Sequence, residues 1–183
     1  PNYNFVYDQV VTCGEMISSK ILSVYLSDND MGSQWLDARD FIKTDTNYRE
    51  GVVNWEDTEK NISQLDKAKT YVTQGFIGSD ENNFTVSLGR EGSDYSAAIF
   101  AYCLNAKDMT IWKDVPGVMT GDPRKFENVE LLSNISYEEA IEMAYYGASV
   151  IHPKTLQPLK QKSIPFFVKS FISPEKAGTK LGI

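Results

Sequence analysis

The chain has 183 residues, with 18 Lys plus Arg against 25 Asp plus Glu, so its formal net charge at pH 7 is −7. A domain typically has about 150 residues, and an apolar fraction of 42% supports a substantial core, which excludes a disordered chain. The acidic balance argues against a general binder of nucleic acid or of anionic membranes. A small anionic ligand stays compatible, because it responds to local groups rather than to net charge.

Two cysteines and one histidine limit the metal and redox chemistry of the chain. Cys13 and Cys103 are too few for a disulfide framework, and together with His152 they do not complete a zinc site. We expect two reduced, mostly buried thiols in a cytoplasmic protein. The sequence has neither an apolar run long enough for a membrane span nor the features of a signal peptide.

The first half of the chain predicts helices and short strands. Apolar residues follow helical spacing over 9–26. Residues 35–43 could form a strand or a short helix, and of the two we expect the strand. Residues 44–68 show no strong period and predict a loop followed by a weak helix. The β-branched and aromatic runs 70–78 and 84–88 predict two strands, which a polar turn joins into a hairpin.

Strands and helices alternate in the second half. We expect helices over 94–104, 137–146 and 153–162, and strands over 109–113 and 164–171. Ser136 and Glu139 have the spacing of a capping box, Gly147 provides a helix stop, and Pro153 stands at a first helical position. This alternation implies parallel crossovers, so we expect one compact α/β domain over 1–183, with a largely parallel sheet covered by helices.

The loop SLGREGSDYSAA, residues 87–98, is the strongest local signal for a binding site. A strand ends there, glycines permit close approach of the backbone, and a helix begins whose N-terminus favours an anion. Arg90 adds a planar fork for a carboxylate or phosphate, and Asp94 lies in the first helical turn. The alternative is a tight connection in which Ser93 only caps the helix.

Three further segments carry candidate groups. The loop 114–124 follows a predicted buried strand, at the edge of the sheet where α/β proteins bind ligands, although it could be an ordinary surface loop. Its Asp114, Asp122 and Arg124 could bind a nucleotide or its metal. His152 could be a base or a ligand, or simply a helix-cap residue. Glu15 could bind an ammonium group, or only complement a helix dipole.

Four ordered blocks resemble the catalytic domain of the aspartokinase family, in the amino-acid-kinase superfamily. They read QGFIGSDENNFTVSLGREGSDYSAA, IWKDVPGVMTGDPRK, ISYEEAIEMAYYGASVIHPKTL and IPFFVKSF, and VTCGEMISSKIL and WLDARDFI match upstream. The resemblance implies a three-layer αβα sandwich with a largely parallel central sheet. It also implies transfer of the γ-phosphoryl of MgATP to the side-chain carboxylate of L-aspartate, the first step towards lysine, threonine and methionine.

The same resemblance assigns roles to residues of the substrate pocket. Glu15 would hold the α-ammonium of aspartate, and Arg90 would bind one of its carboxylates. Phe76, Ser93 and the loop glycines would shape the pocket. Asp94 would be the catalytic carboxylate that organises the groups of phosphoryl transfer.

For ATP, the resemblance implies a site formed by Asp114, Arg124 and the backbone of 113–119. Gly89 would also belong to this site, where it would let a phosphate come close to the backbone. Three positions depart from the family pattern. Lys113 replaces a threonine, Met119 replaces a tyrosine, and Ser149 replaces a lysine. The second change exchanges an aromatic contact for a flexible thioether.

The family pattern also includes a Lys-Phe-Gly-Gly-Thr-Ser segment, whose lysine stabilises the transferring phosphoryl, and regulatory amino-acid-binding (ACT) domains. Because neither occurs in these 183 residues, we expect an incomplete catalytic domain with little or no kinase activity on its own. The resemblance implies a homo-oligomer for the full-length protein. A non-catalytic nucleotide-binding or regulatory module is the alternative function, and a kinase for glutamate or acetylglutamate is a third.

Overall fold

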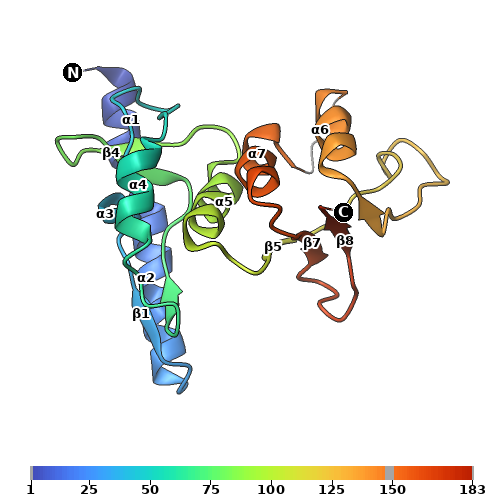
Figure 1. Ribbon diagram of the computed structural model, residues 1–183, viewed down its shortest axis with the longest axis horizontal. Helices are drawn as coiled ribbons and strands as arrows, with labels where there is room; N and C mark the ends of the chain where they lie inside the picture. Colours follow the sequence, from blue (N-terminus) through green and yellow to red (C-terminus); the bar gives the residue numbers. More distant parts are fainter. Residues whose placement is uncertain (1, 147–150, 183) are drawn as a thin grey trace. The chain divides into compact units, whose positions relative to one another are not determined.

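The computed structural model describes residues 2–146 and 151–182 of the chain. The chain forms two compact units, Pro1–Leu104 and Asn105–Ile183. Each unit has its own helices and strands (Figure 1). The boundary follows the last residue of a helix, and Asn105 has a left-handed backbone with φ 48°.

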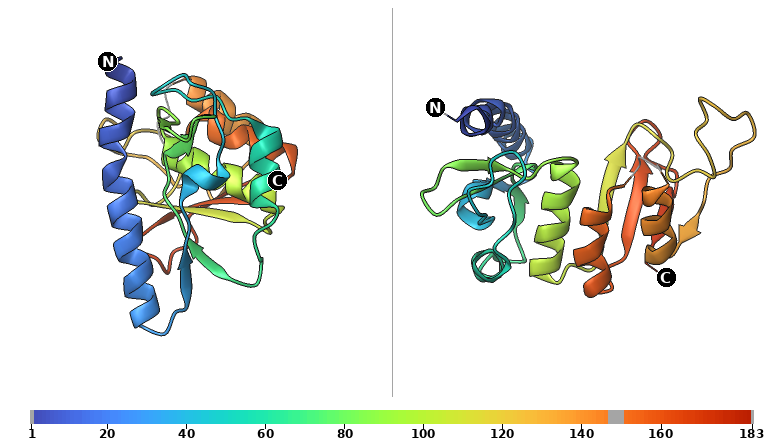
Figure 2. Two further views of the ribbon diagram at one scale, coloured as in Figure 1. Left: turned by 90° about the vertical axis from the view of Figure 1, so that its left-hand side faces the viewer. Right: turned by 90° about the horizontal axis from the view of Figure 1, so that it is seen from above.

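Unit 1 begins with two helices, α1 (Tyr3–Val11) and α2 (Cys13–Asp28), which lie end to end (Figure 2). The single predicted helix over 9–26 is therefore wrong in its start and in its continuity. It starts early because the side chain of Asn2 accepts a hydrogen bond from the Asn4 N–H. The division falls at Thr12, whose hydroxyl donates to the Asp8 carbonyl at 2.6 Å.

The strands of unit 1 are short. β1 (Ser33–Trp35) pairs in parallel with β2 (Thr70–Val72), and β3 (Ile77–Ser79) pairs antiparallel with β4 (Thr85–Ser87). The predicted hairpin is thus confirmed, with Ile77 opposite Ser87. The strand predicted over 70–78 is interrupted, because Phe76 has φ 72° and cannot continue an extended ladder.

Three further helices complete unit 1: α3 (Ala38–Phe41), α4 (Trp55–Ile62) and α5 (Gly92–Leu104). The strand predicted over 35–43 is wrong, because the side chain of Asp37 accepts from the Arg39 N–H and starts α3. A buried apolar cluster holds α4 and α5 to the strands and loops of this unit. It consists of Ile42, Val53, Ile62, Leu88, Tyr95, Ile99 and Cys103.

Unit 2 has one mixed sheet in the order β5-β7-β8-β6. Its elements are β5 (Met109–Lys113), β6 (Asn134–Ile135), α6 (Tyr137–Tyr145), α7 (Pro153–Gln161), β7 (Phe166–Ser170) and β8 (Thr179–Leu181). The pairs β5–β7 and β6–β8 are parallel, and only β7–β8 is antiparallel. The short β6 and β8 were not predicted, because two- and three-residue strands leave almost no periodic signal.

Both helices of unit 2 begin at a residue whose side chain caps the helix, as the sequence predicted. The capping box of Ser136 and Glu139 is present at α6. His152 caps α7, since its Nδ1 accepts from the Lys154 N–H at 3.2 Å, which agrees with the cap interpretation of this residue. Gly147, the predicted helix stop, lies outside the described residues.

The two cysteines have different surroundings. Cys103 is buried in the core of unit 1, whereas Cys13 is exposed, so the expectation of buried thiols is wrong for Cys13. Cys13 is the first residue of α2, on a helix whose only buried residues are Ser19 and Ser23. Among the described residues, no helix is both long enough and apolar enough to cross a membrane.

Candidate active site

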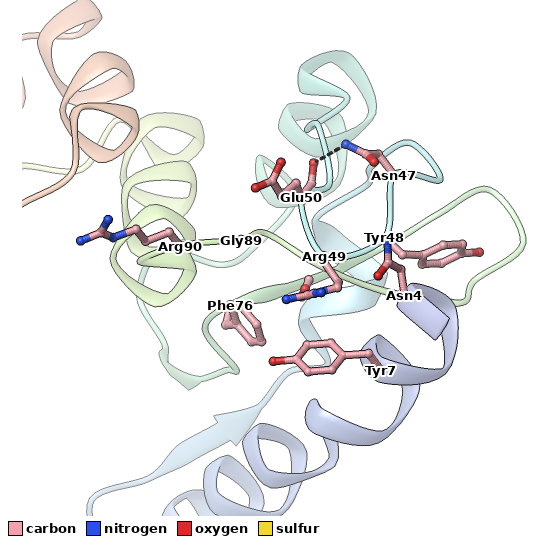
Figure 3. Close-up of a pocket in the computed structure, with 10 residues that line it drawn as sticks. Asn4, Tyr7, Asn47, Tyr48, Arg49, Glu50, Phe76, Gly89 and Arg90 are labelled. Carbon is pink, nitrogen blue, oxygen red and sulfur yellow. Dashed lines mark hydrogen bonds between the residues drawn. The ribbon is translucent and has the colours of Figure 1, made fainter. Parts of the chain in front are cut away.

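Unit 1 contains a pocket of about 540 Å³ beside the start of α5 (Figure 3). Residues from α1, from the loop before α4, from the approach to β3 and from the end of β4 line it. They are Asn4, Tyr7, Asn47, Tyr48, Arg49, Glu50, Phe76, Ser87, Gly89 and Arg90. Three of the residues assigned from the sequence, Phe76, Gly89 and Arg90, are thus brought together here.

At two glycines beside this pocket, the backbone lies very close to a neighbouring segment. Gly89 has φ 77°, and a Cβ on it would stand 3.2 Å from the Arg49 carbonyl oxygen. A Cβ on Gly75 would stand 2.9 Å from the Cα of Ser93, so the segment before Phe76 lies directly against the first turn of α5. The Phe76 N–H donates to the Ser96 hydroxyl at 2.9 Å, which fixes this contact.

Four of the residues predicted for the substrate pocket differ in where they lie relative to it. Arg90 is exposed and its side chain is directed away from Tyr7 (Figure 3). Ser93 and Asp94 lie in the first turn of α5, next to the pocket but not among its lining residues. Glu15 lies in the first turn of α2, half-buried, and does not line the pocket.

Sequence reasoning missed the side of the pocket formed by α1 and by the loop 45–51. Asp8 anchors that side: its side chain is 0% exposed and accepts from the Arg49 N–H, the Ser87 N–H and the Ser87 hydroxyl. Gln9 adds two bonds to the backbone of Thr85. The one available signal was an acidic residue within a helix that also carries apolar residues.

Tyr48 contributes a second fixed point in the same loop. Its hydroxyl donates to Asp80 Oδ2 at 2.8 Å. Burial, together with this hydrogen bond to a carboxylate, raises the pKa of Tyr48 to about 12. The hydroxyl therefore stays protonated at neutral pH and keeps the loop attached to the β3–β4 hairpin.

Unit 2 contains a larger pocket, of about 1110 Å³, between the loop 114–125 and α6. Asp114, Met119 and Arg124, three residues assigned from the sequence, line it. Lys113 is the last residue of β5 and does not line the pocket. Ser149 lies outside the described residues.

Thr179 of β8 anchors the loop of this second pocket through two hydrogen bonds. The Thr179 hydroxyl accepts from the Val118 N–H at 2.8 Å and donates to the Leu132 carbonyl at 2.6 Å. Gly117 has φ 149°, and a Cβ on it would stand 2.5 Å from the Thr179 hydroxyl oxygen. No other residue type fits this position without moving the loop.

Arg124 and Asp122 form an ion pair at the rim of the second pocket, with 3.0 Å between Arg124 Nε and Asp122 Oδ1. Hydrogen bonds from Arg124 lower the pKa of Asp122, and the same contact raises the pKa of Arg124. Both groups stay charged at neutral pH. The described part of the chain has no cluster of three or more His, Cys, Asp or Glu side chains that could hold a metal ion by itself.

Residues 3–170 match the model of the amino acid kinase family. Over 183 residues the chain is 37% identical to lysine-sensitive aspartokinase 3 of Escherichia coli, an alignment that covers 94% of this chain and 39% of that protein. It is 36% identical over 173 residues to the bifunctional aspartokinase/homoserine dehydrogenase of Buchnera aphidicola, covering 93% of this chain and 21% of the relative. The chain thus spans well under half the length of these curated relatives.

Solved structures extend the likeness to the fold. The crystal structure of E. coli aspartokinase III in complex with aspartate and ADP superposes with a TM-score of 0.92 at 36% identity, over 97% of this chain and 41% of that one. A UMP kinase from Bacillus anthracis superposes with a TM-score of 0.69 at 17% identity, over 99% of this chain and 70% of that one, which indicates a shared fold only. The predicted α/β fold with mostly parallel strands is confirmed, and the chain belongs to the amino acid kinase family.

Proposed function

We propose that this chain is the catalytic part of an aspartate kinase, which transfers the γ-phosphoryl of ATP to the side-chain carboxylate of L-aspartate to give 4-phospho-L-aspartate. One observation carries the proposal. Arg90, Phe76 and Gly89, which the family resemblance assigns to the ligands, line one pocket at the N-terminal end of α5. The likeness to an aspartokinase solved with aspartate and ADP supports it.

The chemistry needs positioning and charge neutralisation more than proton transfer. The attacking carboxylate is already ionised at neutral pH, so no general base is required. The N–H groups at the start of α5 and its helix dipole favour negative charge at that end of the pocket. In this proposal Arg90 binds a carboxylate of aspartate, and Phe76 and Ser93 shape the pocket around it.

Asp94 organises the groups around the transferred phosphoryl, and Glu15 receives the α-ammonium of aspartate. Mg²⁺ is usually held by nucleotide phosphates with one or two carboxylates, so it does not need a complete protein cage. The half-buried Asp94, on a helix start, fits such a donor set. The ion, when bound, neutralises phosphate charge.

For the nucleotide, we propose the pocket of unit 2, with Asp114, Met119 and Arg124 as its lining side chains. Lys113 and Ser149 are retained as neighbours of this site on the family pattern alone. Gly89 is proposed to allow close approach of phosphate to the backbone, since glycine has no side chain and its φ of 77° favours that residue there.

Steady-state kinetics of the full-length enzyme test the proposal through two variants. Arg90→Ala should raise KM for aspartate by about 10- to 100-fold and leave KM for ATP nearly unchanged, because it removes a charge-assisted carboxylate contact. Asp94→Ala should lower kcat by a larger factor than it changes KM for aspartate or KM for ATP. Unchanged kinetics in both variants would refute these roles.

Calorimetric titration separates the enzyme from the non-catalytic alternative. Saturable binding of L-aspartate, lost in Arg90→Ala, supports a kinase with an assembled substrate pocket. Binding of a non-hydrolysable ATP analogue without any binding of aspartate supports the nucleotide-binding module. Titration with glutamate and acetylglutamate tests the third candidate substrate class.

A further inference from the structure

The outer side of α1 and α2 carries a continuous apolar stripe. Six residues form it, each of them 40–71% exposed: Tyr3, Val6, Val10, Ile17, Ile21 and Val24. We propose that this stripe binds the same stripe of a second copy of the chain, so that the two helix pairs lie antiparallel about a twofold axis. Such a dimer does not depend on the proposed kinase activity. Its support comes from the shape, the symmetry and the charge of the stripe.

The stripe is regular because α1 and α2 continue one another. Thr12, the residue between them, has helical angles (φ −74°, ψ −12°). At the α-helical step of about 100° per residue, the six stripe residues fall within an arc of about 60°. The buried Asp8, Thr12, Ser19 and Ser23 lie on the opposite side, where α1 packs on β4 and α2 packs on β1 and β2. A narrow seam of this kind is the surface against which another helix packs.

The free side of the two helices is large. In the left view of Figure 2 they run along one edge of unit 1, with the other elements of that unit on one side of them. The exposed parts of the six residues amount to roughly 700 Å² of accessible surface, close to the 800 Å² or so that each partner contributes to a standard interface. The largest apolar patch on a typical monomer is about 300–600 Å². The stripe is therefore large enough for a stable contact.

The spacing of the stripe selects a second copy as the partner. Its successive members are separated by 3, 4, 7, 4 and 3 positions, a series that reads the same in both directions. A twofold axis midway between positions 13 and 14 therefore places Val6 of one copy opposite Ile21 of the other, and Val10 opposite Ile17. An isologous contact needs a patch that is complementary to itself in this way. An unrelated partner helix would require no such symmetry.

The centre of the stripe allows two helices to approach closely. Gly14 has no side chain, and a Cβ built on it would meet no atom within 4 Å, so the position is open to the outside. Cys13 beside it is exposed as well. Small residues at the point where two helices meet favour the short end of the usual interaxial distance of about 8–10 Å.

The stripe also avoids repulsion between two acidic chains. Each chain has a formal net charge of −7, but none of the six stripe residues is charged. Between residues 3 and 24 the carboxylates are Asp8, which is buried, and Glu15, which is half-buried. The Nζ of Lys20 lies 4.7 Å from the centre of the Trp35 ring. Two copies can thus meet along the stripe without desolvating a charge.

Sedimentation of the chain over a concentration series measures this association. We expect wild type to dimerise with a Kd of about 1–100 μM, at the weak end for an interface of standard size. Ile21→Asp should raise this Kd by at least about 30-fold, because it places unpaired carboxylates in the apolar contact. Ile172→Asp is the matched control, since Ile172 is 68% exposed against 65% for Ile21 and lies in unit 2. The Kd of the control should stay within about twofold of wild type.

Disulfide crosslinking tests the antiparallel arrangement. In a Cys13→Ser background the remaining Cys103 is buried, so introduced thiols are the ones that react. A mixture of the Val6→Cys and Ile21→Cys proteins should form a crosslinked dimer under mild oxidation, because these positions face each other. Each protein alone should not crosslink, since equal positions in the two copies lie about 22 Å apart along the helices.

Three results would overturn the inference, and each leaves the proposed function standing. A wild-type chain that stays monomeric at about 500 μM would show that a second copy does not cover the stripe. Equal changes of Kd in Ile21→Asp and Ile172→Asp would place the contact elsewhere. Crosslinking of Val6→Cys alone would show parallel helices. Val10→Asp replaces Ile21→Asp if circular dichroism shows that the latter does not fold.

Discussion

The two pockets of this chain are built in different ways. In unit 1, segments far apart in the sequence meet at a buried carboxylate, and Asp8 bonds Ser87 across 79 positions. In unit 2, one loop of twelve consecutive residues, 114–125, forms most of the wall, with α6 opposite. The first pocket therefore depends on the tertiary structure of its whole unit. The second depends mainly on the conformation of one loop.

The arginines of the two pockets also differ. Arg49 and Arg90 line the pocket of unit 1, and in the described part of the chain neither pairs with a carboxylate. Arg124 in unit 2 is already paired with Asp122. A ligand with two carboxylates finds free donors in the first pocket, whereas a phosphate in the second must compete with a resident carboxylate. This comparison leads to four predictions, in decreasing order of expected effect.

Asp8→Ala should give the largest loss of stability. The substitution leaves the N–H groups of Arg49 and Ser87 and the Ser87 hydroxyl without their buried acceptor. We expect the free energy of unfolding to fall by about 3–5 kcal/mol, with loss of aspartate binding as the loop 45–51 detaches. Urea denaturation and calorimetric titration measure the two effects.

Asp45→Asn is the matched control for Asp8→Ala in the same loop. Asp45 is exposed, and its Oδ1 accepts from the N–H groups of Asn47 and Val52, which an amide oxygen can also do. Its effect on unfolding should stay below about 1 kcal/mol. A similar small effect in Asp8→Ala would contradict the role of Asp8 as the anchor.

Gly117→Ala should produce the corresponding damage in unit 2. The added methyl group would stand 2.5 Å from the Thr179 hydroxyl oxygen and 2.8 Å from a Leu131 methyl, at φ 149°. We expect a loss of about 1–3 kcal/mol in unfolding free energy and weaker binding of the ATP analogue. Gly121→Ala, with contacts no closer than 3.2 Å and no unusual φ, is the control. Equal effects of the two variants would show that the loop adapts freely.

The sequence predicted the second pocket better than the first, for a physical reason. Asp114, Asp122 and Arg124 are close together in the chain and belong to one loop after a strand, so a local pattern was enough to group them. Likewise, the caps of α6 and α7 depend on neighbours within three residues. Local chemistry of this kind is visible without a fold.

The missing half of the first pocket had no local signal. Tyr7 and Arg49 approach each other only because Asp8 is buried against β4, and nothing in the segment 45–51 reveals that contact. The same limit explains the misassigned strand over 35–43, where the cap of Asp37 outweighed the β-branched and aromatic content around it. Glu15, assigned from the family pattern, lies outside the lining residues of both pockets.

Alkaline pH should weaken both units through their tyrosines. The pKa of Tyr48 in unit 1 and of Tyr137 in unit 2 is raised to about 12, chiefly by burial. Because each folded pKa exceeds the ordinary value of 10.0, the stability they contribute is complete below pH 10 and is lost as the pH rises towards 12. Tyr48→Phe and Tyr137→Phe should each flatten the fall of unfolding free energy between these pH values. An unchanged slope in either variant would contradict the assignment of that tyrosine.

Asp122→Asn should give the smallest effect of these predictions, and it should strengthen nucleotide binding rather than weaken it. The amide removes the charge that holds Arg124 at 3.0 Å and leaves the guanidinium available to a phosphate. Both side chains lie at the surface, so thermal stability should scarcely change. We expect binding of the ATP analogue to strengthen by about two- to fivefold at low salt, and this gain to shrink as ionic strength rises. The double variant Asp122→Asn with Arg124→Ala should lose the gain. If the single variant instead weakens nucleotide binding, the pair itself forms part of the site, and the contrast between free arginines in unit 1 and a competed arginine in unit 2 does not hold.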